Sequence, residues 1–173
     1  MISLADTADG AADGEGQPVL DLAQLRVRYP GAASATLDGL NLCLRRGDRL
    51  ALVGPSGCGK STVARAVLQL LPPGSACEGH LTLAGQDPRR LPEAALRRLR
   101  GEAVGLVFQD PMTRLNPLLT VGEHLRDTLA AHQPAGRRQL RNRVRELLAR
   151  VGIPPERYGS YPHEFSGGMR QRV

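Results

Sequence analysis

Residues 54–61 read Gly-Pro-Ser-Gly-Cys-Gly-Lys-Ser, and this stretch decides the fold of the chain. It fits the phosphate-binding pattern G-x-x-x-x-G-K-[ST], in which glycines let backbone N–H groups turn toward one anion. A short apolar run at residues 50–53 precedes it, and helical apolar spacing follows from about Ser61. A glycine-rich turn without a ligand, the alternative, requires neither the strand nor the helix. The context therefore predicts a phosphate-binding loop, or P-loop.

The residue types of this loop suit a nucleotide and Mg²⁺. The Lys60 ammonium is expected to reach the β- and γ-phosphates and to act in catalysis, and the Ser61 hydroxyl is expected to ligate Mg²⁺. Lys60 is the single lysine in a chain whose other 22 basic residues are arginines. We interpret Cys58 as a packing residue rather than a nucleophile. The predicted nucleotide contacts of this loop are Gly54, Pro55, Ser56, Gly57, Cys58, Gly59, Lys60, Ser61 and Thr62.

Composition sets the class of protein. A length of 173 residues fits one domain, and 41% hydrophobic residues are enough for a core. The net charge of +6 permits nucleic acid, an anionic membrane surface or phosphate ligands as partners, but the arginines are spread along the chain, which favours a solvated surface. The three cysteines stand apart, so neither a zinc site nor a disulfide framework is indicated. No secretory signal and no run of about 20 apolar residues is present.

The first part of the chain is patterned as strands around the P-loop. Residues 1–18, rich in Ala, Asp and Gly, are predicted to form a flexible tail. Alternating apolar residues predict strands at 25–29 and 40–44, and continuous apolar runs predict buried strands at 50–53 and 104–108. Short segments at 81–83 and 91–99 are expected to form a strand and an arginine-rich helix.

The character of the sequence changes to helices from about residue 116 to 165. Thr120 and Glu123 have the spacing of a capping box. Apolar residues at helical spacing from Leu140 to Val151, followed by Gly152 and Pro154, predict a second amphipathic helix. A second glycine motif, Ser166-Gly167-Gly168, then opens another helix. Taken alone, it reads as a Ser N-cap followed by flexible residues.

The two glycine motifs together resemble the ATP-binding subunit of ATP-binding-cassette (ABC) transporters. The second motif resembles the ABC signature Leu-Ser-Gly-Gly-Gln, from which it departs at Phe165 and Met169. The whole run from Tyr161 to Val173 is close to the form seen in peptide and nickel importers. The resemblance implies that the signature faces the P-loop of a second subunit in a head-to-tail dimer. Ser166, Gly167 and Gly168 would then hold the γ-phosphate of the partner's ATP.

Two further site residues follow from this resemblance. Residues 109–117, Gln-Asp-Pro-Met-Thr-Arg-Leu-Asn-Pro, resemble the Q-loop of the same importers. Gln109 would contact Mg²⁺ and the attacking water, in a catalytic and metal-binding role; the alternative is a polar strand end before a turn. Tyr29 lies where the family places an aromatic ring that stacks on adenine. From the residues alone it is the last inward side chain of a strand.

The resemblance implies an α/β fold of the P-loop NTPase class: an ABC-type ATPase domain over residues 19–173, with a β-rich and RecA-like core and an α-helical subdomain at about 116–165. The domain is expected to be incomplete at its C-terminus, because the family's acidic strand and switch histidine follow the signature. The implied cofactors are ATP and Mg²⁺.

The implied function is that of an ATP-binding and, when complete, ATP-hydrolysing subunit of an importer for peptides, nickel or a related solute. Its partners would be a second ATP-binding subunit, transmembrane permease subunits and, indirectly, an extracytoplasmic solute-binding protein. It would lie at the cytoplasmic face of the inner membrane. The alternatives are a soluble ABC ATPase acting on nucleic acid or ribosomes, and an inactive fragment.

Overall fold

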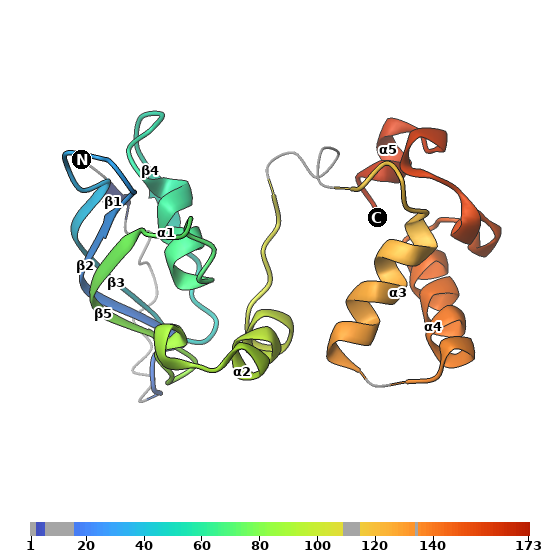
Figure 1. Cartoon of the computed structure of the whole chain (residues 1–173), viewed down its shortest axis with the longest axis horizontal. Coiled ribbons are helices and arrows are strands. Elements are labelled where there is room, and N and C mark those ends of the chain that lie inside the picture. Colours follow the sequence, from blue (N-terminus) through green and yellow to red (C-terminus); the bar gives the residue numbers. More distant parts are fainter. Residues whose placement is uncertain (1–2, 6–15, 109–114, 134) are drawn as a thin grey trace. The chain divides into compact units, whose positions relative to one another are not determined.

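The computed structural model describes residues 3–5, 16–108, 115–133 and 135–173. The chain divides into two compact units, Met1–Leu96 and Arg97–Val173. Each unit has its own buried core (Figure 1). Among the described residues, no helix is both long and apolar enough to cross a bilayer.

The first unit is built on a three-stranded antiparallel sheet. Its order is β3 (Leu37–Leu44), β2 (Leu20–Arg28) and β5 (Ala76–Leu83). In the central strand Leu22 pairs with Leu42 on one side and with Leu81 on the other, and all three side chains are buried. The alternation predicted from the sequence is therefore confirmed, with both β2 and β3 beginning several residues earlier than expected.

The strand before the P-loop differs from its prediction. β4 (Ala51–Val53) has three residues and pairs antiparallel with β1 (Ser3–Ala5), in a register that places Leu52 opposite Leu4. The expected burial is wrong, because Val53 is 52% exposed. An apolar strand is buried when layers cover both of its faces, and within the described part of the chain β1 is the only strand paired with β4. The tail composition did not indicate this pairing of residues 3–5.

The helix after the P-loop is α1 (Lys60–Val67), which buries Val63, Ala66 and Val67. The helix ends at Val67, and two residues later Gln69 adopts a left-handed φ of 54°. The Leu70 N–H then donates to the Arg65 carbonyl at 2.7 Å and closes the helix end. α1 packs against β5, which attaches the P-loop helix to the sheet.

The predicted buried strand at residues 104–108 is absent. α2 (Glu93–Arg98) continues into a π-helical turn, Leu99–Ala103, and the chain then runs without strand pairing to Phe108. Val107 is 92% exposed and Phe108 is 43% exposed. A strand of a sheet forms by pairing its N–H and C=O groups with those of a neighbouring strand, and among the described residues no strand pairs with this segment.

The second unit is helical. α3 (Val121–His132) begins with the predicted capping box: the Glu123 N–H donates to Thr120 Oγ1 at 3.2 Å, and the Thr120 N–H donates to Glu123 Oε2 at 2.8 Å. The bond from the Thr120 N–H, and after it the bond that Thr120 Oγ1 donates to Glu123 Oε2 at 2.9 Å, hold the pKa of the Glu123 carboxyl below its usual range. The predicted helical capping at residue 120 is confirmed.

The remaining helices of the second unit are α4 (Arg137–Arg150) and α5 (Gly167–Arg170). Figure 1 shows α3 and α4 side by side. α4 is followed by Gly152 with a left-handed φ of 69°, as the sequence predicted for the helix end. The core is one apolar cluster formed by Val121, Val144, Leu148, Ile153 and Phe165.

Candidate functional site

The P-loop lies between β4 and α1 and is shaped by glycines in the left-handed region. Gly57 has φ 79° and Gly59 has φ 102°. A Cβ on Gly59 would lie 2.7 Å from Leu37 Cδ2 and 3.1 Å from the Thr36 carbonyl oxygen. Only glycine therefore fits at residue 59, for both its backbone angle and its closeness to β3. The end of the loop therefore passes close to the start of β3.

The first turn of α1 presents an uncapped helix N-terminus. Gly59 is the N-cap residue, no side chain caps the helix, and its first turn carries no acidic residue. The first N–H groups of a helix have no partner inside it and carry the positive end of the helix dipole. This end of α1 is therefore suited to an anion, and phosphate is the common one at such a position.

The Lys60 ammonium sits over the loop. Its Nζ donates to the Gly54 carbonyl at 2.7 Å and to the Pro55 carbonyl at 2.8 Å, and lies 3.6 Å from Cys58 Sγ. These contacts keep the charge at the loop and the α1 N-terminus. The two carbonyls hold an ammonium that phosphate oxygens would attract more strongly, because the bonds to a phosphate join opposite charges.

Tyr29 is joined to the P-loop helix by a hydrogen bond. Its hydroxyl lies 3.2 Å from Thr62 Oγ1, and Thr62 is 5% exposed. Tyr29 directly follows β2, so the end of this strand and the first turn of α1 meet. This contact brings together two of the predicted site residues that are 33 positions apart.

The second glycine motif has the geometry of a capped helix start. Ser166 Oγ accepts a bond from the Met169 N–H at 3.4 Å. Gly167 and Gly168 are exposed, and nothing lies within 4 Å of the place where a Cβ would stand on either. Phe165 is 3% exposed in the core cluster, and Met169 packs against that cluster. The motif is therefore anchored by its flanking apolar residues, while its glycines remain open.

The predicted residues are distributed over both units. Tyr29 and residues 54–62 belong to the first unit, whereas Ser166, Gly167 and Gly168 belong to the second. Gln109 lies outside the residues that the structure describes. Sequence reasoning missed Arg172, whose Nε donates to the Gly168 carbonyl at 3.2 Å. The sequence around this arginine does not indicate which groups its side chain bonds.

The residues of the first unit fit a nucleoside polyphosphate. They combine the bare α1 N-terminus, the Lys60 ammonium and an exposed Ser61 hydroxyl next to it. Mg²⁺ takes six oxygen ligands, and the Ser61 hydroxyl would supply one of them. No group of three or more metal-ligating side chains is found in the described ranges. A Mg²⁺ bound with the nucleotide would take its other ligands chiefly from phosphate and water.

Comparison with known proteins extends these observations over most of the chain. The family model described as "ABC transporter" matches residues 37–173. The chain is 43% identical over 163 residues to the probable D,D-dipeptide transport ATP-binding protein DdpD of Escherichia coli strain K12, covering 91% of this chain and 50% of that protein. It is 43% identical over 159 residues to the oligopeptide transport ATP-binding protein OppD of Bacillus subtilis strain 168, covering 90% and 44%.

A solved structure gives the same picture of the fold. The dimeric structure of MJ0796, a bacterial ABC transporter cassette, matches with a TM-score of 0.67 and 28% identity, covering 88% of this chain and 66% of that one. The chain spans about half the length of the curated relatives it matches.

Proposed function

We propose, since this chain belongs to the ABC transporter family, that it forms the ATP-binding part of a subunit that drives the import of peptides or a related solute. The observation that carries the proposal is the presence on one chain of a P-loop with its ammonium in place and an exposed, serine-capped glycine motif. The transport names of the relatives support peptides as the solute class. They do not favour the alternative of an ATPase acting on nucleic acid or ribosomes.

In the P-loop, ATP would be bound by groups that are already close together. Lys60 Nζ would turn from the Gly54 and Pro55 carbonyls to phosphate oxygens, and the first N–H groups of α1 would donate to the same anion. Ser61 would ligate Mg²⁺. Tyr29, held beside α1 by its bond to Thr62, would lay its ring against adenine. These groups bind and orient the nucleotide.

The glycine motif of the second unit would act on the nucleotide of a second subunit. Ser166 Oγ accepts one long bond of 3.4 Å from the Met169 N–H, and its own O–H would donate to a γ-phosphate. The open surroundings of Gly167 and Gly168 allow an anion to approach the backbone. A head-to-tail dimer of two such subunits would then close on ATP and reopen after its hydrolysis, with Gln109 placing the attacking water.

The complete subunit would work with membrane partners at the cytoplasmic face of the inner membrane. Permease subunits would carry the solute, and a solute-binding protein outside the membrane would deliver it. The ATP-binding subunits would supply the energy of transport by their closure and reopening.

The function is tested with the full-length protein and its permease, in cells that take up a labelled dipeptide or labelled nickel. Lys60→Ala should abolish ATP-dependent uptake, because it removes the only ammonium at the P-loop. Arg65→Ala is the control, since Arg65 is an exposed residue in the last turn of the same helix. Unchanged uptake in Lys60→Ala would contradict the proposal. Uptake of nickel but not of the dipeptide would contradict the solute class alone.

A further inference from the structure

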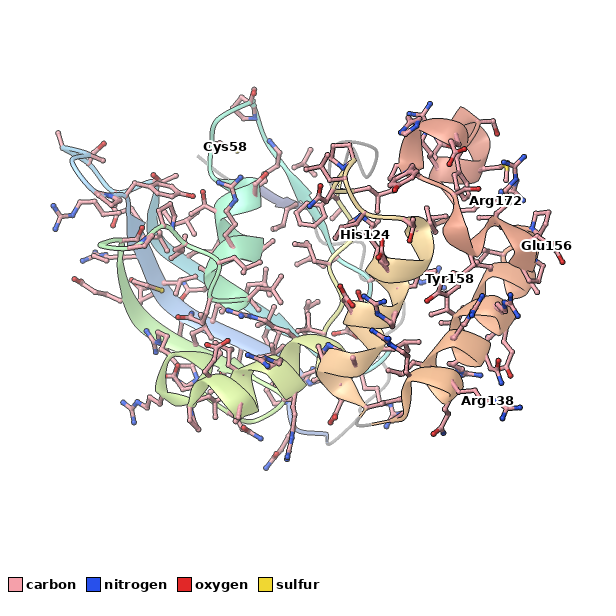
Figure 2. All side chains as sticks on the ribbon, turned by 45° about the vertical axis from the view of Figure 1, so that its right-hand side comes forward. Cys58, His124, Arg138, Glu156, Tyr158 and Arg172 are labelled. Atoms are coloured by element: carbon pink, nitrogen blue, oxygen red, sulfur yellow. The ribbon has the colours of Figure 1, made fainter. Side chains whose placement is uncertain are left out.

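Arg172 ties the glycine motif of the second unit to the end of α4. Its Nη1 donates to the Val151 carbonyl at 3.1 Å and lies 3.3 Å from the Gly152 carbonyl, while its Nε donates to the Gly168 carbonyl at 3.2 Å. One guanidinium therefore joins segments that are 20 residues apart in the sequence. Figure 2 labels Arg172 and shows it in the C-terminal part of the second unit.

The α4 side of this contact is suited to a cation. The last carbonyls of a helix lack partners within it and form the negative end of its dipole, where an arginine is favourable. Val151 and Gly152 directly follow α4 and extend this row of carbonyls. Gly152 has φ 69°, and a Cβ there would lie 3.0 Å from Arg172 Nη1. The glycine thus provides both the helix end and the space for the guanidinium.

The other side of the contact is the motif itself. α5 has four residues, and its serine cap bond is long, at 3.4 Å. So short a helix is not held by its own hydrogen bonds. Met169 and Val173 pack against the core cluster. Gly168 cannot be held in this way, because glycine has no side chain. In the described part of the chain, the Arg172 side chain therefore links the Gly168 peptide to the end of α4.

We infer that Arg172 is a positioning residue for the proposed ATPase reaction. It holds the backbone of Ser166, Gly167 and Gly168 in one conformation, so that these groups are already ordered when the γ-phosphate of the second subunit's ATP approaches. The inference rests on the proposed function. An ordered donor group avoids reorganisation when the charge to be stabilised develops. Lysine would replace this residue only in part, because its ammonium is a compact point charge, whereas the guanidinium directs separate N–H groups toward the two segments.

The test uses the full-length protein with Arg172→Gln and Arg172→Lys. Gly152→Ala disturbs the same contact from the α4 side without changing the arginine. The control is Arg145→Gln. Arg145 is an exposed arginine of α4, and its side chain makes no hydrogen bond or ion pair with the described residues. Three quantities are measured for each variant: the Kd for ATP, the kcat and KM of hydrolysis, and hydrogen exchange of the amides of residues 166–170.

We expect a loss in kcat with little change in nucleotide binding. Arg172→Gln should lower kcat by roughly tenfold or more, the usual scale for a lost charged hydrogen bond, while the Kd for ATP stays within about twofold because the P-loop lies in the other unit. Arg172→Lys should recover only part of kcat. Exchange at residues 166–170 should rise in all three variants of the contact and not in Arg145→Gln.

Two results would overturn the inference. One is an unchanged kcat and unchanged exchange in Arg172→Gln. The other is a loss of ATP binding in parallel with kcat, which would mean that Arg172 serves the fold as a whole. Failure of the proposed function would give a different result: the wild-type protein would neither bind nor hydrolyse ATP. In that case the exchange measurement still decides whether Arg172 fixes the motif.

Discussion

α3 and α4 meet their backbone requirements within each helix, whereas β4 and the segment at residues 104–108 need neighbouring strands to meet theirs. The two helices bury Val121, Val144 and Leu148 in one cluster. By contrast, Val53 on β4 is 52% exposed and Val107 is 92% exposed. Similar apolar side chains thus end in opposite environments. Burial of an apolar run depends on what the surrounding chain places beside it, not on its hydrophobicity alone.

The largest expected effect is on the core of the second unit. Phe165→Ala should lower the free energy of unfolding by about 3–5 kcal/mol, because Phe165 is 3% exposed and its loss leaves a cavity. Urea unfolding measures the total, and hydrogen exchange assigns it to residues 97–173. Phe165→Leu is the matched control and should cost less than about 1.5 kcal/mol. An equal loss of hydrogen-exchange protection in both units would contradict the view that each unit is stabilised by its own core.

A smaller effect is expected at the α3 cap. Thr120→Ala should cost roughly 1 kcal/mol, because it removes the acceptor of the Glu123 N–H. Thr120→Ser keeps the hydroxyl and should behave as wild type. The pKa of Glu123 is lowered in the folded protein, so its carboxylate favours folding at neutral pH, and this contribution is lost as pH falls through the lowered pKa. Thr120→Ala keeps the backbone donor to this carboxylate and loses only the bond from Thr120 Oγ1. The stability difference between wild type and Thr120→Ala in thermal unfolding should therefore be somewhat smaller at acid pH than at pH 7. A constant difference would contradict this account of the capping box.

The smallest effect is expected at residue 107. Val107→Ser should change the free energy of unfolding of this chain by less than about 0.5 kcal/mol, because the side chain is 92% exposed. Val144→Ser provides the comparison, since Val144 is fully buried on α4. A loss above about 1 kcal/mol at residue 107 would indicate that the segment is packed, as the apolar sequence predicts for a strand.

Prediction from the sequence worked best where the deciding interactions are local. The capping box joins residues three positions apart, and the Ser166 cap likewise reaches Met169. The alternation along β2 is equally visible in a short window. Sequence-based prediction failed for residues 50–53 and 104–108. Their apolar runs are compatible with a buried strand, but they do not indicate which strand would pair with it.

The candidate site divides in the same way. The P-loop pattern identified Lys60, whose ammonium lies on the loop, and the resemblance drew attention to Tyr29. The structure added that Tyr29 bonds Thr62 on α1, and that Gly59 lies against Leu37 of β3. The role of Gln109 stays a prediction.

By itself, then, the sequence determined the phosphate-binding loop, the helix caps and the family of this protein, because each depends on residue types at short, set spacings. Only the tertiary structure decided the contacts of Tyr29 with Thr62 and of Arg172 with Val151. These pairs are 33 and 21 residues apart. Such contacts depend on how strands and helices pack, and a local pattern contains no information about which distant backbone will accept a given side chain.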